Sequence, residues 1–592
     1  MKEFVKMTLA TIAGLFLFGF VAMFMMFAVV GALAAAGGSQ PVMPREGVLS
    51  IDMSKIMLSE QTVEVDPISM LSAGGAVPEQ IGIWSAINAI NAAATDPAIK
   101  FIYLKPDGLS GQYAQTEEFR KALAAFRATS GKAIVAFTES PGNGSYYLAS
   151  VADKIYMSPY DGGINSLSGI SSQLIFLKDI LDRLGINVQL IRHGKYKSAG
   201  EMFIRSSSSK ENLEQNEAMV ASLWKTLSTE ISQSRGITVE EFNSMIDNLE
   251  LNFPQDFLEK GLVDELLTRE ELQQKIADLY VTDNYKNVKS ISLTDYATLK
   301  NTVNYKAKKK IAVIYANGDI IDGNEKQNVA GDRFAKIIAD VRKDSTIKAV
   351  VLRVNSPGGS VLASEKIKTE LDMLREEVPI IASYGGYAAS GGYWISANTD
   401  YIFSNETTLT GSIGVFSMVP DMSKAINDKL HINITPVNSN KHSDMLSGMR
   451  PLNEQEIAYM QASVERIYDK FTELVANGRD KTVEEVDEIA QGRVWTGAEA
   501  LEIGLVDKIG TIEDALNYAL LSVEGANSLS DVQIVEYPKP MSTIDILLEE
   551  IMGTEAVFAG TPLENVEAAF RKVTAAQTGK AYARIPYEIA LN

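Results

Sequence analysis

The sequence predicts an α/β protein in which one domain occurs twice, behind an apolar N-terminal segment. Three observations lead to this prediction. A long stretch near the N-terminus carries no charge, four landmarks recur in the same order in both halves, and short β-branched runs alternate with stretches of helical periodicity. Such alternation is typical of parallel sheets with crossover helices. A chain of 592 residues is also too long for one ordinary core.

The N-terminal segment is predicted to be a transmembrane helix. Residues 7–36 form an uncharged run of 30 residues. A spanning helix needs about 20, and the apolar core of a cleaved signal peptide only about 7–15. Lys2 and Lys6 precede the run, and cationic flanks stay cytoplasmic. We therefore expect residues 1–38 to be a cytoplasmic tail and single-pass anchor, with the later domains on the periplasmic side of a bacterial inner membrane. The alternative is a cleaved secretory signal that uses the small residues at 32–36.

The duplication shows in landmarks whose spacing changes slowly along the chain. Lys100 pairs with Lys348 at an offset of 248 residues, and Gly261 pairs with Gly504 at an offset of 243. Between them, "GSYYLASVADKIYMS" pairs with "GGYWISANTDYIFSN", and "RLGINVQL" pairs with "KLHINITP". Small loop deletions in a duplicated domain leave such a drift, whereas chance similarity would not preserve the order.

The predicted strands and helices divide the chain into five segments. The strands include "KKKIAVIYANGDII", "IKAVVLRV" and "VPIIASYGG", and the helices include "SEKIKTELDMLREE" and "EIAYMQASVERIYDKFTELVANGR". After the anchor we expect a first domain at 47–275, a linker at 276–305, a second domain at 306–540 and a last segment at 541–592. The last segment opens with a predicted helix that Ser542 can cap. We expect this helix to pack against the second domain or a neighbouring subunit.

Composition and charge exclude several functions. The net charge of −20 disfavours nucleic acid as a partner, because an acidic surface repels phosphates. The absence of cysteine excludes disulfides, thiolate metal sites and cysteine nucleophiles. The three histidines, His193, His431 and His442, are scattered and form no HExxH pair, and no phosphate-binding loop is present. We therefore expect neither a metal nor another cofactor.

Two glycine-containing stretches are candidates for chemistry. "VNSPGGSVLASEKI" starts where a strand is predicted to end, and Gly358 and Gly359 would let the backbone approach a ligand and direct N–H groups at an oxyanion. An ordinary strand-to-helix turn explains the same residues, so both interpretations stay open on this stretch alone. "NETTLTGSIGVF" holds Ser412, which is either a turn residue or a nucleophile whose partner lies elsewhere in the chain. Close packing explains the small residues at 382–398, and we expect no catalytic role there.

Four motifs together resemble a known family. "LRVNSPGGS", "YAASGGYWIS", "TLTGSIGVF" and "VWTGAEALEIGLVD" are similar to signal peptide peptidase A, also called protease IV, in its long tandem-domain form. The resemblance covers nearly the whole chain after the anchor. It implies tandem domains of the ClpP/crotonase-like superfamily and a serine–lysine dyad, with the serine of the TGSIG stretch as nucleophile and the lysine of a YKSA motif as general base. These residues are Ser412 and Lys197, and we predict that Gly358 and Gly359 serve the oxyanion or the substrate.

Each half retains one part of this predicted dyad. The first copy has "NSLSGISSQ" in place of the TGSIG stretch, and Lys197 corresponds to Ser443 of the second copy. The site must therefore form where copies meet, within one chain or between subunits. A lysine, with an ordinary pKa of about 10.4, can act as a base only when burial keeps it neutral. Lys195 is the rival base, Ser198 could orient Lys197, and His442 is the candidate for a histidine-based mechanism.

The resemblance also implies substrates and partners. It predicts that the protein digests remnant signal peptides at the outer face of the inner membrane and assembles as a homotetramer. Two other classes of function stay open. One is an inactive membrane scaffold or regulator with the same fold, and the other is a CoA-binding enzyme of the crotonase type. Export argues against the second, because CoA is cytosolic.

Overall fold

The computed structural model describes residues 6, 11, 14–21, 41–62, 78–163, 165–301, 303–539 and 581–585. Most of the predicted anchor at 1–38 lies outside the described residues, and so does the predicted helix after Ser542. Within the ranges that are described, no helix is both long and apolar enough to cross a bilayer. The anchor therefore stays a prediction from the sequence.

The first half forms a parallel sheet. Its strand order is β8-β6-β5-β4-β1-β9, and each neighbouring pair is parallel. The β-branched and aromatic residues of these strands suit a sheet that is covered on both faces. The strands are β1 (Gly47–Asp52), β4 (Ile99–Lys105), β5 (Ile134–Thr138), β6 (Lys154–Met157), β8 (Glu265–Leu266) and β9 (Ser290–Ser292).

The second half repeats this order as β20-β16-β15-β13-β10-β21, again with parallel neighbours. This match confirms the duplication predicted from the sequence landmarks. The sheet continues beyond β15 through β17 (Leu409–Gly411) and the antiparallel β19 (Val494–Thr496). The other strands are β10 (Lys310–Asn317), β13 (Ile347–Ser356), β15 (Ile380–Ala389), β16 (Tyr401–Ser404), β20 (Lys508–Ile509) and β21 (Gln533–Tyr537).

Residues 276–305, the predicted linker, contain regular secondary structure. They contain the end of α11 (Arg269–Tyr280), the edge strand β9 and helix α12 (Leu293–Lys300). Leu293 and Tyr296 of α12 are fully buried in the core. A three-residue strand and a short helix give too little periodicity to be recognised in the sequence.

Crossover helices cover the sheets. The helices α3 (Ile83–Thr95) and α4 (Tyr113–Ser130) of the first half correspond to α13 (Gly331–Lys343) and α14 (Val361–Arg375) of the second. Two long helices, α8 (Lys210–Arg235) and α16 (Glu454–Arg479), follow in equivalent places, and each starts at a side-chain cap, Ser209 and Asn453. The remaining helices are α5 (Asn143–Ala149), α6 (Lys178–Leu184), α7 (Glu201–Ile204), α9 (Val239–Asp247), α10 (Pro254–Glu259), α15 (Gly391–Trp394), α17 (Val483–Ile489), α18 (Gly497–Glu502) and α19 (Ile512–Leu520).

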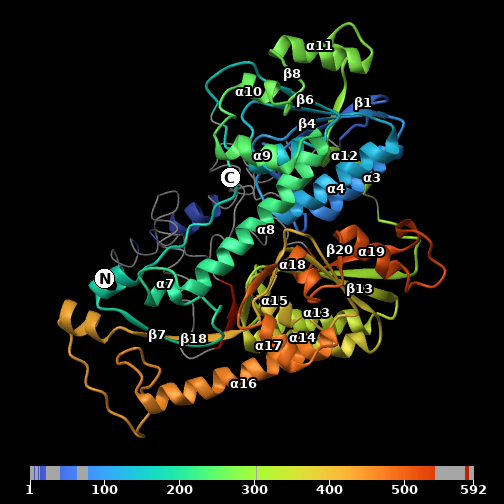
Figure 1. The fold of residues 1–592 in the computed structure, drawn as a ribbon. Coiled ribbons are helices and arrows are strands. Elements are labelled where there is room, and N and C mark those ends of the chain that lie inside the picture. The colour runs from blue at the N-terminus through green and yellow to red at the C-terminus, as the bar shows by residue number, and fades with distance from the viewer. Residues whose placement is uncertain are drawn as a thin grey trace.

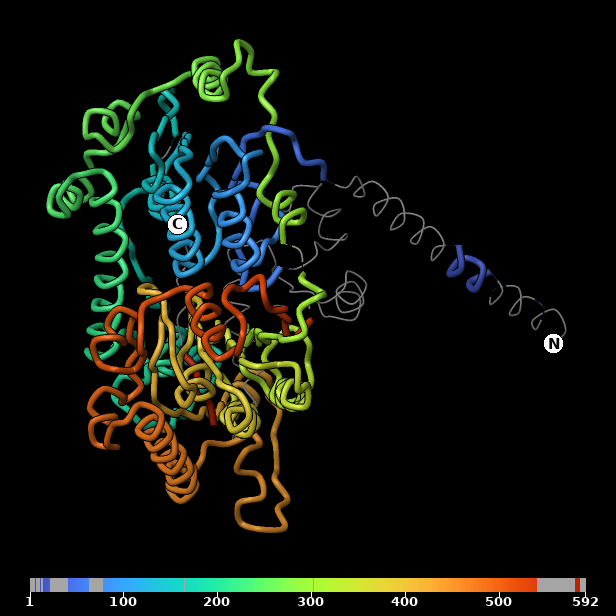
Figure 2. The backbone as a smooth tube through the Cα atoms, turned by 90° about the vertical axis from the view of Figure 1, so that its right-hand side faces the viewer, coloured from blue at the N-terminus to red at the C-terminus, as the bar shows by residue number. Residues whose placement is uncertain are grey.

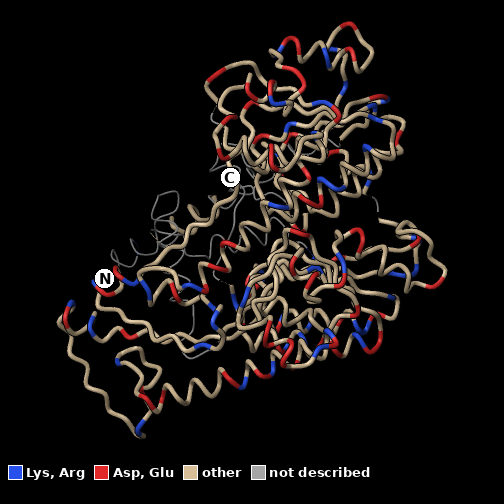
Figure 3. Tube along the Cα trace, viewed as in Figure 1, with Lys and Arg blue, Asp and Glu red and all other residues tan. Residues whose placement is uncertain are grey.

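The two halves stack on each other, with α8 running from the first half to the second (Figures 1 and 2). Helix α4 packs against β15, and α3 packs against α19. One continuous apolar core contains residues of both halves, such as Ile87 and Phe119 with Val351 and Ile381. Charged residues of both signs are interspersed along the trace (Figure 3). The first half is thus a packing partner of the second sheet as well as a domain of its own.

A third sheet crosses between the halves, in the order β12-β11-β14-β22-β18-β7. Strand β7 comes from the first half and pairs antiparallel with β18 of the second half. The strands are β7 (Asn187–His193), β11 (Ile320–Ile321), β12 (Val329–Ala330), β14 (Gly358–Ser360), β18 (Val415–Asp421) and β22 (Tyr582–Arg584). A separate pair, β2 (Ile56–Ser59) with β3 (Glu79–Gly82), completes the strands of the described ranges.

Candidate active site

The pairing of β7 with β18 brings the two predicted catalytic segments together. It runs from Asn187 opposite Asp421 to His193 opposite Val415. Lys197 follows shortly after the end of β7, and Ser412 lies shortly before the start of β18. In an antiparallel pair the end of one strand lies beside the start of the other. A single chain therefore places both residues at the same end of this ladder.

The Lys197 amine contacts two serines. Its Nζ lies 2.9 Å from Ser412 Oγ, 3.0 Å from the Ser412 carbonyl oxygen and 2.7 Å from Ser390 Oγ. All three residues are at most 1% exposed. A neutral amine has two N–H donors and one lone pair. It can donate to Ser390 Oγ and to the carbonyl and accept from the Ser412 hydroxyl, so a neutral lysine can make all three contacts.

Burial holds the pKa of Lys197 well below its ordinary value. The cause is desolvation, which penalises the charged ammonium form, and no carboxylate in the described ranges forms an ion pair with the amine to oppose it. A lysine in this state can accept a proton from a hydroxyl at a pH where an exposed lysine cannot.

A third segment, residues 491–493, fixes the backbone of Ser412. Ser412 has a φ of +51°, in the left-handed region that non-glycine residues rarely adopt. Its N–H donates to the carbonyl of Arg493 at 2.7 Å, and the N–H of Gly492 donates to the carbonyl of Ile413 at 2.8 Å. Such strain persists where the surrounding structure holds it, which is typical of functional sites.

The same segment also contacts the lysine. The Tyr196 N–H donates to the carbonyl of Gln491 at 2.9 Å. Gly492 has a φ of +79°, and a Cβ built there would lie 2.6 Å from both the backbone N and the Cβ of Lys197. Residues 491–493 therefore link the backbones of the serine and the lysine, and Gly492 must be small for them to do so.

Gly358 and Gly359 lie in strand β14, and Ser360, the last residue of this strand, caps α14. A Cβ at Gly358 would lie 2.0 Å from the Ala583 carbonyl oxygen of β22. The glycine therefore permits a close backbone approach, as expected from the sequence. Whether the glycine amides serve an oxyanion stays a prediction.

Strand β22 lies as an extended peptide between β14 and β18. The Ile585 N–H donates to the Pro357 carbonyl at 3.0 Å, and Ala583 is fully buried opposite Gly359. The Ile585 side chain belongs to an apolar cluster with Met219, Leu223, Tyr387, Ala389, Leu409 and Val494. The site thus has a backbone edge and an apolar cluster that together hold an extended segment.

The rival residues lie elsewhere. Lys195 is exposed, and its Nζ lies 5.1 Å from the ring centre of Tyr196. Ser198, considered as an orienting residue for Lys197, accepts from Gln215 Nε2 at 3.0 Å. The contacts of Lys197 Nζ in the described structure go to other serines.

The histidines do not contact Ser412 in the described part of the chain. His442 Nδ1 lies 2.8 Å from Glu456, at the start of α16. His193 contacts Glu465 and stacks on another aromatic ring, and His431 is exposed. The geometry gives no support to a histidine-based mechanism.

Ser390 is a residue of the site that we did not predict from the sequence. We assigned no catalytic role to residues 382–398, but Ser390 contacts the Lys197 amine and has a φ of +55°. Its N–H donates to the carbonyl of Gly411, the residue before Ser412, at 2.8 Å. A serine inside a run of glycine and alanine was the available signal, and close packing alone seemed sufficient to explain that run.

The fold and the site define a class of protein. Two parallel α/β halves place a serine hydroxyl against a buried amine, next to a strand that accommodates an extended peptide. This arrangement is typical of a serine peptidase, because the amine can take the hydroxyl proton while the serine attacks a carbonyl.

The comparison with known proteins gives the family. The model of peptidase family S49 matches residues 125–282 and 372–524, one segment in each half. The chain is 34% identical to Protease 4 of Salmonella typhi, over 90% of this chain and 88% of the relative. It is 32% identical to Protease 4 of Haemophilus influenzae, over 82% and 81%, and 29% identical to the chloroplastic serine protease SPPA of Arabidopsis thaliana, over 82% and 74%. The chain therefore belongs to peptidase family S49, in its tandem form, and is a serine peptidase.

Proposed function

We propose that this protein hydrolyses peptide bonds with Ser412 as the nucleophile and Lys197 as the general base. The observation that carries the proposal is the 2.9 Å contact between Ser412 Oγ and Lys197 Nζ at a buried position where desolvation lowers the pKa of the amine. An inactive scaffold would have no reason to bury a lysine against a strained serine. Burying an amine without a carboxylate partner is unfavourable for stability.

The reaction proceeds in two halves. The Ser412 hydroxyl gives its proton to Lys197 Nζ while Oγ bonds to the carbonyl carbon of the scissile peptide. The ammonium then donates this proton to the leaving amine as the C–N bond breaks, which leaves an acyl ester on Oγ. A water molecule, deprotonated by the same amine, attacks the ester, and Ser412 recovers its proton. Ser390 Oγ accepts one N–H of the amine and so turns the lone pair toward the hydroxyl.

The substrate lies as an extended strand in the place that β22 occupies. Backbone hydrogen bonds along β14 give affinity that does not depend on sequence, whereas the apolar cluster around Ile585 selects an aliphatic side chain. Remnant signal peptides have an apolar core and match these two requirements. Gly358 and Gly359, on the paired strand, are the proposed amides for the oxyanion, which requires the Gly358 N–H to leave Ser356 Oγ, 3.2 Å away.

The proposal includes a place for the reaction. The uncharged run at 7–36 supports a single-pass enzyme of the inner membrane with its catalytic domains on the periplasmic side, where signal peptides are released. The resemblance noted above supports a homotetramer, which light scattering of the detergent-solubilised protein tests. Each chain carries both members of the dyad, so the site does not need a second subunit.

The test uses a fluorophosphonate probe, which labels activated serines. Wild type is expected to label, Ser412→Ala not at all, and Lys197→Ala about 10²–10⁴-fold more slowly. Lys195→Ala is the matched control and should label at the wild-type rate. Labelling of Ser412→Ala would place the nucleophile elsewhere, and loss of labelling in Lys195→Ala but not Lys197→Ala would show that the base is misassigned.

A further inference from the structure

Two adjacent glutamates of α4, Glu117 and Glu118, reach from the first half into the loop that leads to Ser412. This loop, residues 405–408, precedes the three-residue strand β17, and Ser412 follows that strand directly. Both glutamate side chains are fully buried. Neither residue takes part in the proposed chemistry.

Glu117 uses both carboxylate oxygens on the loop. The N–H groups of Glu406 and Thr407 each donate to it at 3.0 Å, and the Thr407 hydroxyl donates to it at 2.7 Å. Lys121, one turn further along α4, also contacts this carboxylate. Hydrogen bonds to a charged acceptor are about twice as strong as neutral ones. The loop backbone is therefore held by one side chain from the other half of the chain.

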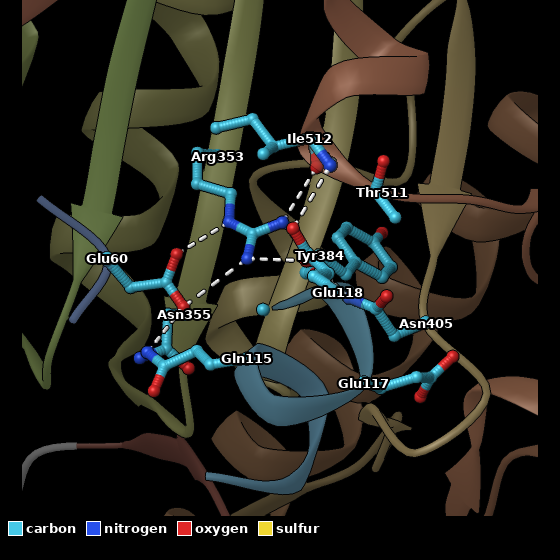
Figure 4. Close-up of polar contacts among 12 residues, drawn as sticks. Glu60, Gln115, Glu117, Glu118, Arg353, Asn355, Tyr384, Asn405, Thr511 and Ile512 are labelled. Atoms are coloured by element: carbon cyan, nitrogen blue, oxygen red, sulfur yellow. Dashed lines mark hydrogen bonds and ion pairs between the residues drawn. The ribbon is translucent and has the colours of Figure 1, made fainter. Parts of the chain in front are cut away.

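Glu118 contacts Asn405, the first residue of the loop, and Arg353 of strand β13. It accepts from Asn405 Nδ2 at 2.6 Å, from the Ile512 N–H at 3.2 Å and from Arg353 at 2.8 Å. Arg353, in the central strand β13, lies between Glu118 and Glu60, a second carboxylate of the first half (Figure 4).

Stability alone does not account for this cluster. A buried ion pair often contributes no more to stability than apolar side chains of the same size, because desolvation of the charges offsets their attraction. Buried charges do impose geometry, since each carboxylate oxygen must meet its donors. Here the donors include backbone N–H groups of residues 406 and 407, so the geometry imposed is that of the loop itself.

The chain between the loop and the nucleophile is short and paired on both sides. Strand β17 lies between β15 and β19. The Thr408 hydroxyl donates to the carbonyl of Gly385 at 2.7 Å, and Ser390 donates to Gly411 at the other end of the strand. A shift of the loop therefore displaces β17 along β15, and with it Ser412.

We propose that Glu117 and Glu118 are positioning residues for peptide hydrolysis: they set the register of β17 and hence the place of the Ser412 hydroxyl relative to Lys197. This inference rests on the proposed role of Ser412. The first half then supplies both the general base and the two carboxylates that hold the loop before β17.

The test measures fluorophosphonate labelling of the full-length protein and separates the rate constant from the labelled amount. The labelled amount reports the folded fraction, and the rate constant reports how well the hydroxyl is placed. We expect Glu117→Gln and the isosteric Thr407→Val to lower the rate constant at least tenfold at full labelled amount, because displacements near 1 Å can slow a reaction about 10²-fold. Thr407→Ser retains the hydroxyl and should restore the wild-type rate. The pH midpoint should stay at its wild-type value, because the surroundings of Lys197 are unchanged.

The controls separate positioning from a general effect on the fold. Glu230 contacts Arg120, also on α4, and accepts from Tyr147 at 2.8 Å, and both of these partners lie in the first half. Glu230→Gln should label at the wild-type rate, and equal slowing in this variant would overturn the proposal. A wild-type rate constant in Thr407→Val, with or without a lower labelled amount, would also overturn it, even if Glu117→Gln fails to fold. Labelling of Ser412→Ala in the same experiment would instead refute the proposed nucleophile.

Discussion

Replacing Gly492 by alanine should displace Lys197 from the nucleophile. The added Cβ would lie 2.6 Å from the backbone N and Cβ of Lys197, whereas ordinary van der Waals contact begins at 3.4 Å. These neighbours are backbone atoms and the first side-chain carbon of Lys197, which cannot rotate away. Either the 491–493 segment or the lysine backbone must therefore move by most of this difference, about 0.8 Å.

This displacement predicts a large loss of activity with a small loss of stability. A shift near 1 Å at reacting groups can lower the rate about 10²-fold. A left-handed φ adds roughly 1–2 kcal/mol of strain for alanine. We expect kcat/KM for a chromogenic peptide to fall between tenfold and a hundredfold, with most of the loss in kcat, because the strand that holds the substrate is not touched.

Gly525 provides the matched control. Its φ is +73°, and a Cβ there would meet no atom within 4 Å. Gly525→Ala therefore introduces similar backbone strain without the contact to Lys197. It should lower the free energy of unfolding by a similar amount, roughly 1–2 kcal/mol, and leave kcat/KM unchanged. If Gly492→Ala and Gly525→Ala hydrolyse the peptide equally well, the idea that Gly492 fixes the position of the lysine is wrong.

Four further predictions follow from the site. Because burial lowers the pKa of Lys197 and the neutral amine is the base, kcat/KM should be level above that pKa and fall about tenfold per pH unit below it; a break near pH 10 would indicate an ordinary lysine. At pH 7 Lys197 binds fewer protons in the native state than in the unfolded chain, so Lys197→Met should raise the free energy of unfolding. This gain in unfolding free energy should shrink by up to about 1.4 kcal/mol per pH unit as the pH rises toward 10. A gain that urea titrations show to be the same at every pH would contradict the neutral amine. Ser390→Ala removes one acceptor of the amine and should lower kcat about tenfold, and an unchanged kcat would exclude an orienting role. Ile585→Asp places a charge in the apolar cluster and should dislodge β22 from the proposed substrate position, which lowers KM. Leu521→Asp, at a side chain that is 80% exposed, should leave KM unchanged. Equal KM values for the two variants would show that β22 does not compete with substrate.

The parts of the fold that the sequence predicts are those with strong local patterns. The β-branched runs of β10, β13 and β15 and the amphipathic helices α14 and α16 are recognisable within ten to thirty residues. The duplication is recognisable because its landmarks are long. By contrast, β9 and α12, within the predicted linker, are not recognisable in the sequence because their few buried residues stand among polar ones.

The candidate site was predictable only as residue identities. Resemblance to a family indicated Ser412 and Lys197, but nothing local in the sequence shows that β7 pairs with β18, since register between distant strands depends on the partner. The positive φ values of Ser390 and Ser412 are equally invisible, because tertiary contacts impose them. The glutamates of α4 have the appearance of an ordinary solvated helix face, and their burial results from the docking of the second half.

Lys197 and Ser412 are 215 residues apart in the chain, and in the proposed mechanism this separation determines when activity can begin. A ribosome adds about 5–20 residues per second, so the amine is synthesised roughly 10–40 s before the hydroxyl. During this interval the nascent polypeptide lacks the proposed nucleophile. Strand β7 is also unpaired on the edge that later binds β18, because β18 has not yet been translated. In the proposed mechanism the protein is thus latent until its second half has folded onto the first.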